Sequence, residues 1–203
     1  PIYFNYINSM KHDIKPHLPD NFSIGHFMII GEAPGAEEVQ QGKPFVGRSG
    51  KLLREVLEQC GVNISDTYIT NVFYERPPNN DVNYFFSSRM SAIRQDLEIN
   101  ESIPTLRGKY VKVPYDEAIA RLYEEIITVQ PRMILTVGAT PMWAVTGKDK
   151  ITEGRGFTTM TIAGKEFPVM STFHPAGILR RREWYDLFKS DIKQAVENAN
   201  RLC

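Results

Sequence analysis

The stretch "HFMIIGEAPGAEEVQQGKPFVGRSGKLLREVLEQCG", residues 26–61, joins a short apolar run to a helical pattern through a glycine-rich segment. Residues 26–31 are typical of a buried strand, because the apolar run is short and ends at glycine. Residues 48–61 predict a helix, since apolar side chains recur there at helical spacing and Gly61 can end it. Residues 31–50 hold five glycines and two prolines. So much backbone freedom directly after a strand suggests that a ligand sits against this backbone.

The same alternation of strand and helix continues along the chain. Strands are predicted at 67–72, 132–138 and 167–172, and helices at 115–131, 139–147 and about 183–200. This order implies βαβ units, so we predict an α/β fold, a three-layer α/β/α sandwich with a central four-stranded, mostly parallel sheet. Ligands of such sheets bind beyond the carboxyl ends of the strands. The loops that follow the predicted strands are therefore the place to look for a site.

One segment is too long to be an ordinary connection. We predict a single domain over 1–203 with an insertion at about 79–114, which packs as a subdomain or flap. Within it, apolar residues at helical spacing predict a helix: Phe86, Met90, Ile93 and Leu97. A hairpin is expected over 105–113, around Gly108.

Composition limits the class of protein. Lys and Arg number 24 and so do Asp and Glu, so any basic surface for a nucleic acid must be local. No window approaches the 18 apolar residues of a membrane span and no secretory signal opens the chain, so we expect a cytoplasmic protein without a membrane partner. The two cysteines, Cys60 and Cys203, are expected to be reduced thiols, and the four histidines are too scattered for a structural metal.

Three loops carry a recognisable set of motifs. They read "GEAPGAEEVQQGKPFVG" (31–47), "TNVFYERPP" (70–78) and "TFHPAGILRR" (172–181). Neither glycine-rich phosphate-binding fingerprint is present among them. The ordered set resembles the uracil-DNA glycosylase superfamily, most closely its family 4 and related bacterial and phage forms. That family's pattern is G-E-x-P-G-x-x-E, G-x-P-F-V-G, T-N-V and H-P-A-x-x-L-R, and the resemblance covers roughly 27–78 and 115–195.

The resemblance implies a monofunctional DNA glycosylase that flips out uracil and hydrolyses its N-glycosidic bond, leaving an abasic site. Two alternatives stay open. One is a glycosylase for a modified or hypermodified pyrimidine, for example of phage DNA, and the other is a non-catalytic DNA-binding or replication-accessory domain of the same fold. The expected partner is DNA containing uracil or a modified pyrimidine, and we expect a monomer, nucleoid-associated, of bacterial or viral origin.

Three residues are implied to hold and release the base. The resemblance makes Phe45 the ring that stacks on uracil, a role that suits the energetics of base–aromatic stacking. Asn71, at a strand end, offers an amide donor and acceptor that match O4 and N3–H of uracil, whereas cytosine reverses that pattern. His174 would donate to O2 and stabilise the uracil anion. The plainer alternatives are a core phenylalanine, a turn asparagine and a surface histidine.

Carboxylates and backbone from the first loop complete the implied pocket. Glu32 positions or activates the water, or faces the cationic sugar, and Glu38 borders the pocket near C5. The neighbouring backbone is expected to approach the nucleotide at Ala33, Pro34 and Gly35. Because Ala33 stands where family 1 enzymes carry the aspartate that handles water, the general base is open, and Asp66, before the second strand, is another candidate.

The third loop is implied to grip DNA. Ile178 aligns with the apolar wedge that family members push into the gap left by the flipped base. Arg180 and Arg181 would meet phosphates, although a charge run at a helix start is ordinarily a solvated face.

The chain departs from family 4 in its cysteines. Most family 4 enzymes hold an iron–sulfur cluster on four cysteines, one of them in the pattern C-R-P-P. This chain has "ERPP" with Glu75 in that place, no C-x-x-C in 1–25 and no cysteine in 79–114. We therefore expect no cofactor and no iron–sulfur cluster.

Overall fold

The computed structural model describes residues 16–20 and 26–201 of the chain, and a mixed sheet lies at its centre. The strands follow the order β2-β1-β6-β8-β7. They are β1 (Phe27–Gly31), β2 (Thr67–Asn71), β6 (Met133–Val137), β7 (Gly156–Ile162) and β8 (Lys165–Thr172). The first four strands in this order run parallel, and β7 pairs antiparallel with β8. The predicted α/β class with a mostly parallel sheet is thus confirmed.

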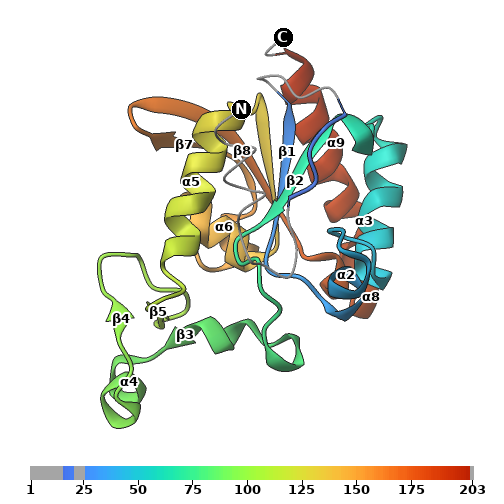
Figure 1. Ribbon diagram of the computed structural model, residues 1–203. Coiled ribbons are helices and arrows are strands. Elements are labelled where there is room, and N and C mark those ends of the chain that lie inside the picture. Colours follow the sequence, from blue (N-terminus) through green and yellow to red (C-terminus); the bar gives the residue numbers. More distant parts are fainter. Residues whose placement is uncertain (1–15, 21–25, 202–203) are drawn as a thin grey trace.

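Helices cover both faces of the sheet (Figure 1). On one face lie α3 (Arg48–Gln59), α8 (Pro175–Arg180) and α9 (Tyr185–Arg201), and on the other lie α5 (Glu117–Val129) and α6 (Ala139–Thr146). The strand side chains alternate between the two faces. Ile29 and Leu135 join the apolar cluster under α3 and α9, whereas Ile30 and Ile134 join the cluster under α5. This alternation produces the three predicted layers.

The sheet differs from the prediction in having a fifth strand. β7 was missed because its sequence, "GFTTMTI", has few apolar residues, and half of its side chains are exposed. Such a pattern is typical of an edge strand. β7 lies at the edge of the sheet and pairs only with β8. The bounds of the other predicted strands and of the helices outside the insertion agree with the structure to within a few residues at each end.

The segment predicted as an insertion forms a small antiparallel sheet of its own (Figure 1). Its strands follow the order β3-β5-β4, and α4 (Arg89–Gln95) connects two of them. The strand bounds are β3 Phe86–Ser87, β4 Ile99–Asn100 and β5 Tyr110–Lys112. Phe85, Phe86 and Val111 are buried in the same apolar cluster as Trp143 of α6. The insertion is therefore packed onto the main body rather than hanging from it.

Two details of that segment correct the prediction. Phe86 belongs to β3, and the remaining residues of the predicted helix face are exposed: Met90, Ile93 and Leu97. A tight turn does surround Gly108, through an antiparallel bridge between Leu106 and Lys109. However, β5 continues from this turn to pair with β3 and β4, because these strands bury its Val111.

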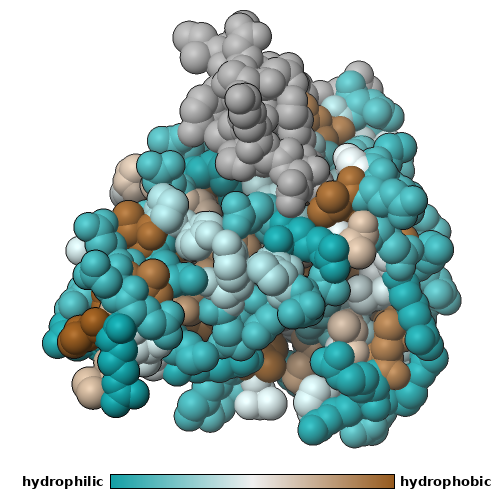
Figure 2. Space-filling model, turned by 60° about the horizontal axis from the view of Figure 1, so that its bottom comes forward, coloured by the Kyte–Doolittle hydropathy of each residue, from teal (hydrophilic) through white to brown (hydrophobic). Residues whose placement is uncertain are grey.

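The parallel strands bring their carboxyl ends to one edge of the sheet, the lower edge in Figure 1. Figure 2, which turns that edge forward, shows a mainly hydrophilic face with apolar residues in small separate areas. Within the described part of the chain, no helix combines the length and the apolar character that a membrane span needs.

Candidate functional site

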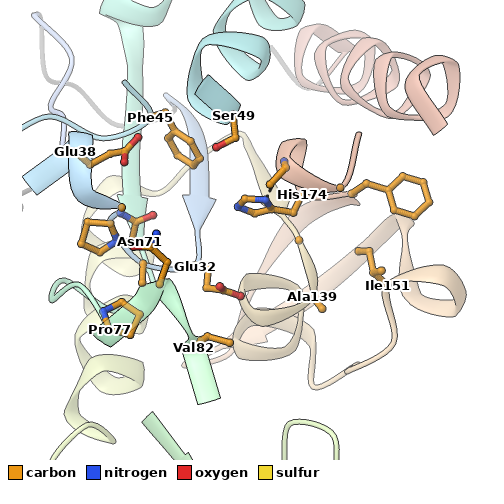
Figure 3. A pocket seen from close by; sticks show the side chains of 18 of the residues that line it. Glu32, Glu38, Phe45, Ser49, Asn71, Pro77, Val82, Ala139, Ile151 and His174 are labelled. Carbon is orange, nitrogen blue, oxygen red and sulfur yellow. Dashed lines mark hydrogen bonds between the residues drawn. The ribbon is translucent and has the colours of Figure 1, made fainter. Parts of the chain in front are cut away.

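A cavity of about 610 Å³ opens at the carboxyl edge of the sheet (Figure 3). Its walls come from the loops after β1, β2, β6 and β8, as expected for a parallel sheet covered on both faces. Most of the residues predicted for the site line it: Glu32, Ala33, Pro34, Gly35, Glu38, Phe45, Asn71, His174 and Arg180. Three predicted residues do not line it, namely Asp66, Ile178 and Arg181.

Gly31, the last residue of β1, brings two of the predicted side chains together. A Cβ atom at Gly31 would lie 2.3 Å from Oδ1 of Asn71 and 2.6 Å from Cζ of Phe45. The ring and the amide therefore lie directly over the backbone of Gly31. Any residue with a side chain at this position would collide with both of them. Figure 3 shows both side chains at the same wall of the cavity.

The turn that carries Phe45 is held from two sides. The Glu38 carboxylate accepts hydrogen bonds from the backbone N–H groups of Val46 (3.0 Å) and Gly47 (2.7 Å) through the same oxygen, Oε1. Arg54 of α3 donates to the carbonyl oxygens of Pro44 and Phe45, each at 2.8 Å. These bonds hold Phe45 at a φ of 53°, a left-handed conformation that is costly for a residue with a side chain. Glu38 thus holds the turn that carries the Phe45 ring, a role that its sequence position alone did not suggest.

Asn71 ends β2 and is almost completely buried, with 6% of its surface exposed. Its backbone carbonyl accepts a hydrogen bond of 2.8 Å from Nη2 of Arg121, a residue of α5. Arg121 pairs with Glu125 one turn later, and Glu125 also accepts from the hydroxyl of Tyr74. Sequence reasoning missed this buried network, because charges four residues apart on a helix normally form a solvated pair.

His174 is the N-cap of α8, and one nitrogen of its ring accepts a hydrogen bond. The backbone N–H of Ala176 donates to Nδ1 over 3.1 Å, so in the neutral ring the proton sits on Nε2. Burial lowers the pKa of His174 below its ordinary value, although the nearby Glu32 carboxylate partly offsets this shift. The backbone of Gly138 approaches the ring so closely that a Cβ there would lie 3.3 Å from Cδ2. The site therefore holds a neutral imidazole with one donor.

Glu32 lies in the same cavity (Figure 3). The hydroxyl of Thr140, in the first turn of α6, donates to its Oε2 over 2.5 Å. Thr140 is buried, with only 2% of its surface exposed. This bond fixes one carboxylate oxygen and leaves the other for a ligand. Thr140 was not among the predicted residues, because a threonine in a helical run gives no signal in sequence.

Asp66 and Ile178 lie where their predicted roles do not fit. Asp66 precedes β2, at the far end of that strand from Asn71, which is about 16 Å away for five residues of extended chain. Its carboxylate accepts from the side chain of Asn63 over 2.7 Å. Ile178 is completely buried in the apolar cluster under α3 and α9, so it cannot serve as an exposed wedge. The motif did not show that Asp66 lies at the end of β2 away from the cavity, or that Ile178 lies on the buried face of α8.

Arg180 and Arg181 separate in space. Arg180 is exposed and lines the cavity. Arg181 lies outside it, with its guanidinium carbon 4.7 Å from the centre of the Trp184 ring. The chain direction changes between these residues, because α8 ends at Arg180.

The insertion also contributes to the cavity, which sequence reasoning did not specify. Three of its residues line the cavity, namely Asn80, Val82 and Arg107, and Pro77 lines it from just before the insertion. The predicted flap beside the pocket came without named residues. The sequence of a long connection does not indicate which of its side chains reach a cavity formed by distant loops.

The residues present do not fit an iron–sulfur cluster. Such clusters are held by cysteine thiolates, usually four, and this chain has two cysteines. Cys60 follows α3 as a free thiol, and Cys203 lies outside the described residues. Across residues 16–20 and 26–201, no cluster of three or more His, Cys, Asp or Glu side chains is placed to hold a metal ion.

The fold and this cavity define a class of protein that comparison with known families identifies. Residues 25–199 match the uracil DNA glycosylase superfamily, and the chain belongs to this superfamily. It is similar to the "Type-4 uracil-DNA glycosylase" of Thermotoga maritima, with 34% identity over 174 residues, covering 83% of this chain and 74% of that protein. The protein of the same name from Pyrobaculum aerophilum is 33% identical over 171 residues, covering 81% of this chain and 74% of its own. That from Archaeoglobus fulgidus is 30% identical over 173 residues, covering 84% and 75%.

Proposed function

We propose that this chain is a monofunctional uracil-DNA glycosylase, which takes an extruded uracil into the cavity, hydrolyses its N-glycosidic bond and leaves an abasic site. The observation that carries the proposal is the convergence of Phe45, Asn71 and His174 on one cavity. The similarity to proteins named type-4 uracil-DNA glycosylases supports the same activity.

The base is held between an aromatic face and an amide edge. The Phe45 ring stacks on the pyrimidine, an interaction that contributes about 1–3 kcal/mol for a base on an aromatic ring. The Asn71 side chain donates to O4 and accepts from N3–H. Gly31 leaves room for both groups, and Arg121 holds the backbone of Asn71, so the amide has a fixed place beside the ring. With its N–H₂ toward O4 of uracil, this amide rejects cytosine, whose donor and acceptor are reversed.

His174 stabilises the leaving group. Breaking the bond between N1 and C1′ leaves a pair of electrons on uracil, shared by its oxygens. The Nε2–H of the neutral imidazole donates to O2, and a donor placed beforehand in a buried site needs no reorganisation during the reaction. The lowered pKa of His174 keeps the ring in this form at pH 7.

Glu32 is our choice for the residue that handles water. Two carboxylates line the cavity within the described chain, and the Oε1 of Glu38 already accepts two backbone N–H groups. Glu32, oriented by Thr140, accepts the proton of the water that attacks C1′ and faces the positive charge on the sugar. The water oxygen forms the new bond to C1′, and the electrons of the old bond leave with uracil.

The simplest test is a gel assay on oligonucleotides that carry a single uracil, single-stranded and double-stranded, with alkali to break abasic sites. We expect strand breaks at uracil only after incubation with the protein. Parallel substrates with 5-hydroxymethyluracil and with no altered base complete the set. Absence of breaks with every substrate would contradict the enzymatic proposal and leave a DNA-binding domain.

His174→Gln tests the role of the imidazole. We expect the single-turnover rate to fall by about 10²- to 10³-fold, the usual effect of removing one such donor, while DNA binding is kept. His26→Gln, at the opposite end of β1, is the matched control and should retain the wild-type rate. In the wild type, the acid limb of the pH–rate profile should lie below 6.5, because the pKa of His174 is lowered. A rate that survives His174→Gln would remove this residue from the mechanism.

A second substrate class is favoured by one observation. The insertion supplies part of the cavity wall through Asn80 and Val82. A wall of this origin suits a pyrimidine with a larger 5-substituent, and faster release of 5-hydroxymethyluracil than of uracil would support it.

A further inference from the structure

The insertion carries a cation to the mouth of the cavity. Arg107 is exposed, lines the cavity and lies at the centre of the turn between Leu106 and Lys109. Across the described residues, the structure gives its guanidinium no ion pair and no hydrogen bond to a carboxylate. The charge is therefore available to a ligand.

The turn around Arg107 is attached to the main body at three points. The indole N–H of Trp143 donates to the carbonyl oxygen of Pro104 over 2.9 Å. The backbone N–H of Arg107 itself donates to Oδ2 of Asp149 over 3.0 Å, across 42 residues of sequence. Leu106 is buried in the apolar cluster shared with α5 and α6. These contacts fix the base of the Arg107 side chain relative to the cavity.

The backbone at this position does not favour arginine. Arg107 has a φ of 52° and Gly108 a φ of 74°, the pattern of hairpin turns in which Asn, Asp and Gly are preferred. A residue with a side chain is strained in the left-handed region. Such strain at a cavity rim points to a function for the side chain that the turn alone does not supply.

A second cation lies on the other side of the cavity. Arg180 lines it from the end of α8, and Figure 1 shows α8 and the insertion on opposite sides of the lower edge of the sheet. An extruded nucleotide keeps a phosphate on each side of its sugar. Two cations that flank the cavity therefore match the two directions in which the strand leaves it.

We propose that Arg107 binds a backbone phosphate of the DNA strand that carries the extruded nucleotide, on the side opposite Arg180. The insertion is then a second DNA-binding element in addition to the loop after β8. The planar guanidinium can contact two phosphate oxygens at once. This inference rests on the proposed function, since it takes the extruded nucleotide to occupy the cavity.

Salt-dependent DNA binding of Arg107→Ala tests the inference in the full chain. The probe is a fluorescent single-stranded oligonucleotide whose single uracil carries a 2′-fluoro group that slows cleavage. Loss of one phosphate contact should reduce the slope of log K against log salt by about 0.7 and weaken binding about fivefold at 0.1 M salt. Arg94→Ala, an exposed cation of α4 outside the cavity, is the matched control and should keep the wild-type slope.

Two more variants separate binding from folding. Arg107→Lys keeps the charge and should keep most of the slope. Arg107→Gly removes the charge but suits the positive φ, so it should unfold at a temperature no lower than wild type while binding DNA as weakly as Arg107→Ala.

The outcomes distinguish this inference from the proposed function. A wild-type slope in Arg107→Ala, in a protein that cleaves uracil DNA, would overturn the inference alone. An unchanged slope with an altered preference between uracil and 5-hydroxymethyluracil would mean that Arg107 contacts the base, and would also overturn it. A wild-type protein that binds the probe but never cleaves uracil DNA would overturn the proposed function.

Discussion

At the scale of single residues, Gly31 has the largest consequence for the site. Its missing side chain is the space in which the Phe45 ring and the Asn71 amide meet. Gly31→Ala should therefore displace one of them while the fold persists. We expect the single-turnover rate on uracil DNA to fall by about 10²-fold, since displacements near 1 Å have effects of that size.

Gly164, in the turn between β7 and β8, offers a control substitution away from the cavity. Gly164 has a φ of 79° and open space around it. Gly164→Ala should lower the free energy of unfolding by about 1 kcal/mol and leave the rate unchanged. Equal rates for Gly31→Ala and wild type would show that the two side chains are not seated as described.

The sequence predicted individual site residues where a strand end fixes their place. Glu32, Asn71 and His174 each lie within two residues of the carboxyl end of a parallel strand, so the topology brings them to one edge. It could not predict Asp66 or Ile178 in the same way. Asp66 precedes its strand, and only packing decides that Ile178 turns into the core.

At the scale of elements, α5 supports the end of β2 through a buried ion pair. Arg121 and Glu125 have 8% and 1% of their side chains exposed. Arg121→Met should lower the free energy of unfolding by about 3–5 kcal/mol, because it leaves the Glu125 carboxylate buried without its partner. Urea unfolding followed by circular dichroism measures the change.

The exposed pair on α9 is the matched comparison. Lys193 and Glu197 have the same spacing along their helix, but 71% and 51% of their side chains are exposed. Lys193→Met should change stability by no more than about 0.5 kcal/mol. Similar losses for the two variants would argue against a structural role for the Arg121 pair.

Spacing of apolar residues was enough to predict α5 but not the burial of its charges. Ile119, Leu122 and Ile126 form the expected stripe, while Arg121 and Glu125 lie beside it. They are buried because the loop after β2 folds over them, a contact between segments 50 residues apart. The same limit explains α4, whose apolar residues Met90 and Ile93 stay exposed.

At the scale of the whole molecule, stability should depend on mildly acidic pH. Burial lowers the pKa of both His174 and His17, so the unfolded chain binds protons at a higher pH than the folded chain does. Stability is thus fully present above pH 6.5 and is lost as the pH falls below this value. Urea unfolding at pH 7.5 and 5.5 should give the smaller free energy at pH 5.5. His174→Gln should reduce the difference, and equal stability at the two values would contradict the assignment.

The overall layering followed from the alternation of strands and helices, whereas the placement of the insertion did not. Its position depends on aromatic packing across the chain. Phe85 stacks on Phe73 with ring centroids 3.9 Å apart, and Phe86 meets Trp143 edge to face at 5.3 Å. Neither contact has a local sequence signal.

This aromatic packing decides what genetic excision of residues 79–114 would yield. Trimming the chain to a minimal catalytic core would uncover Phe73 and Trp143, two large rings that are now shielded from water. A truncated product should therefore aggregate or misfold instead of behaving as a smaller version of the same catalyst.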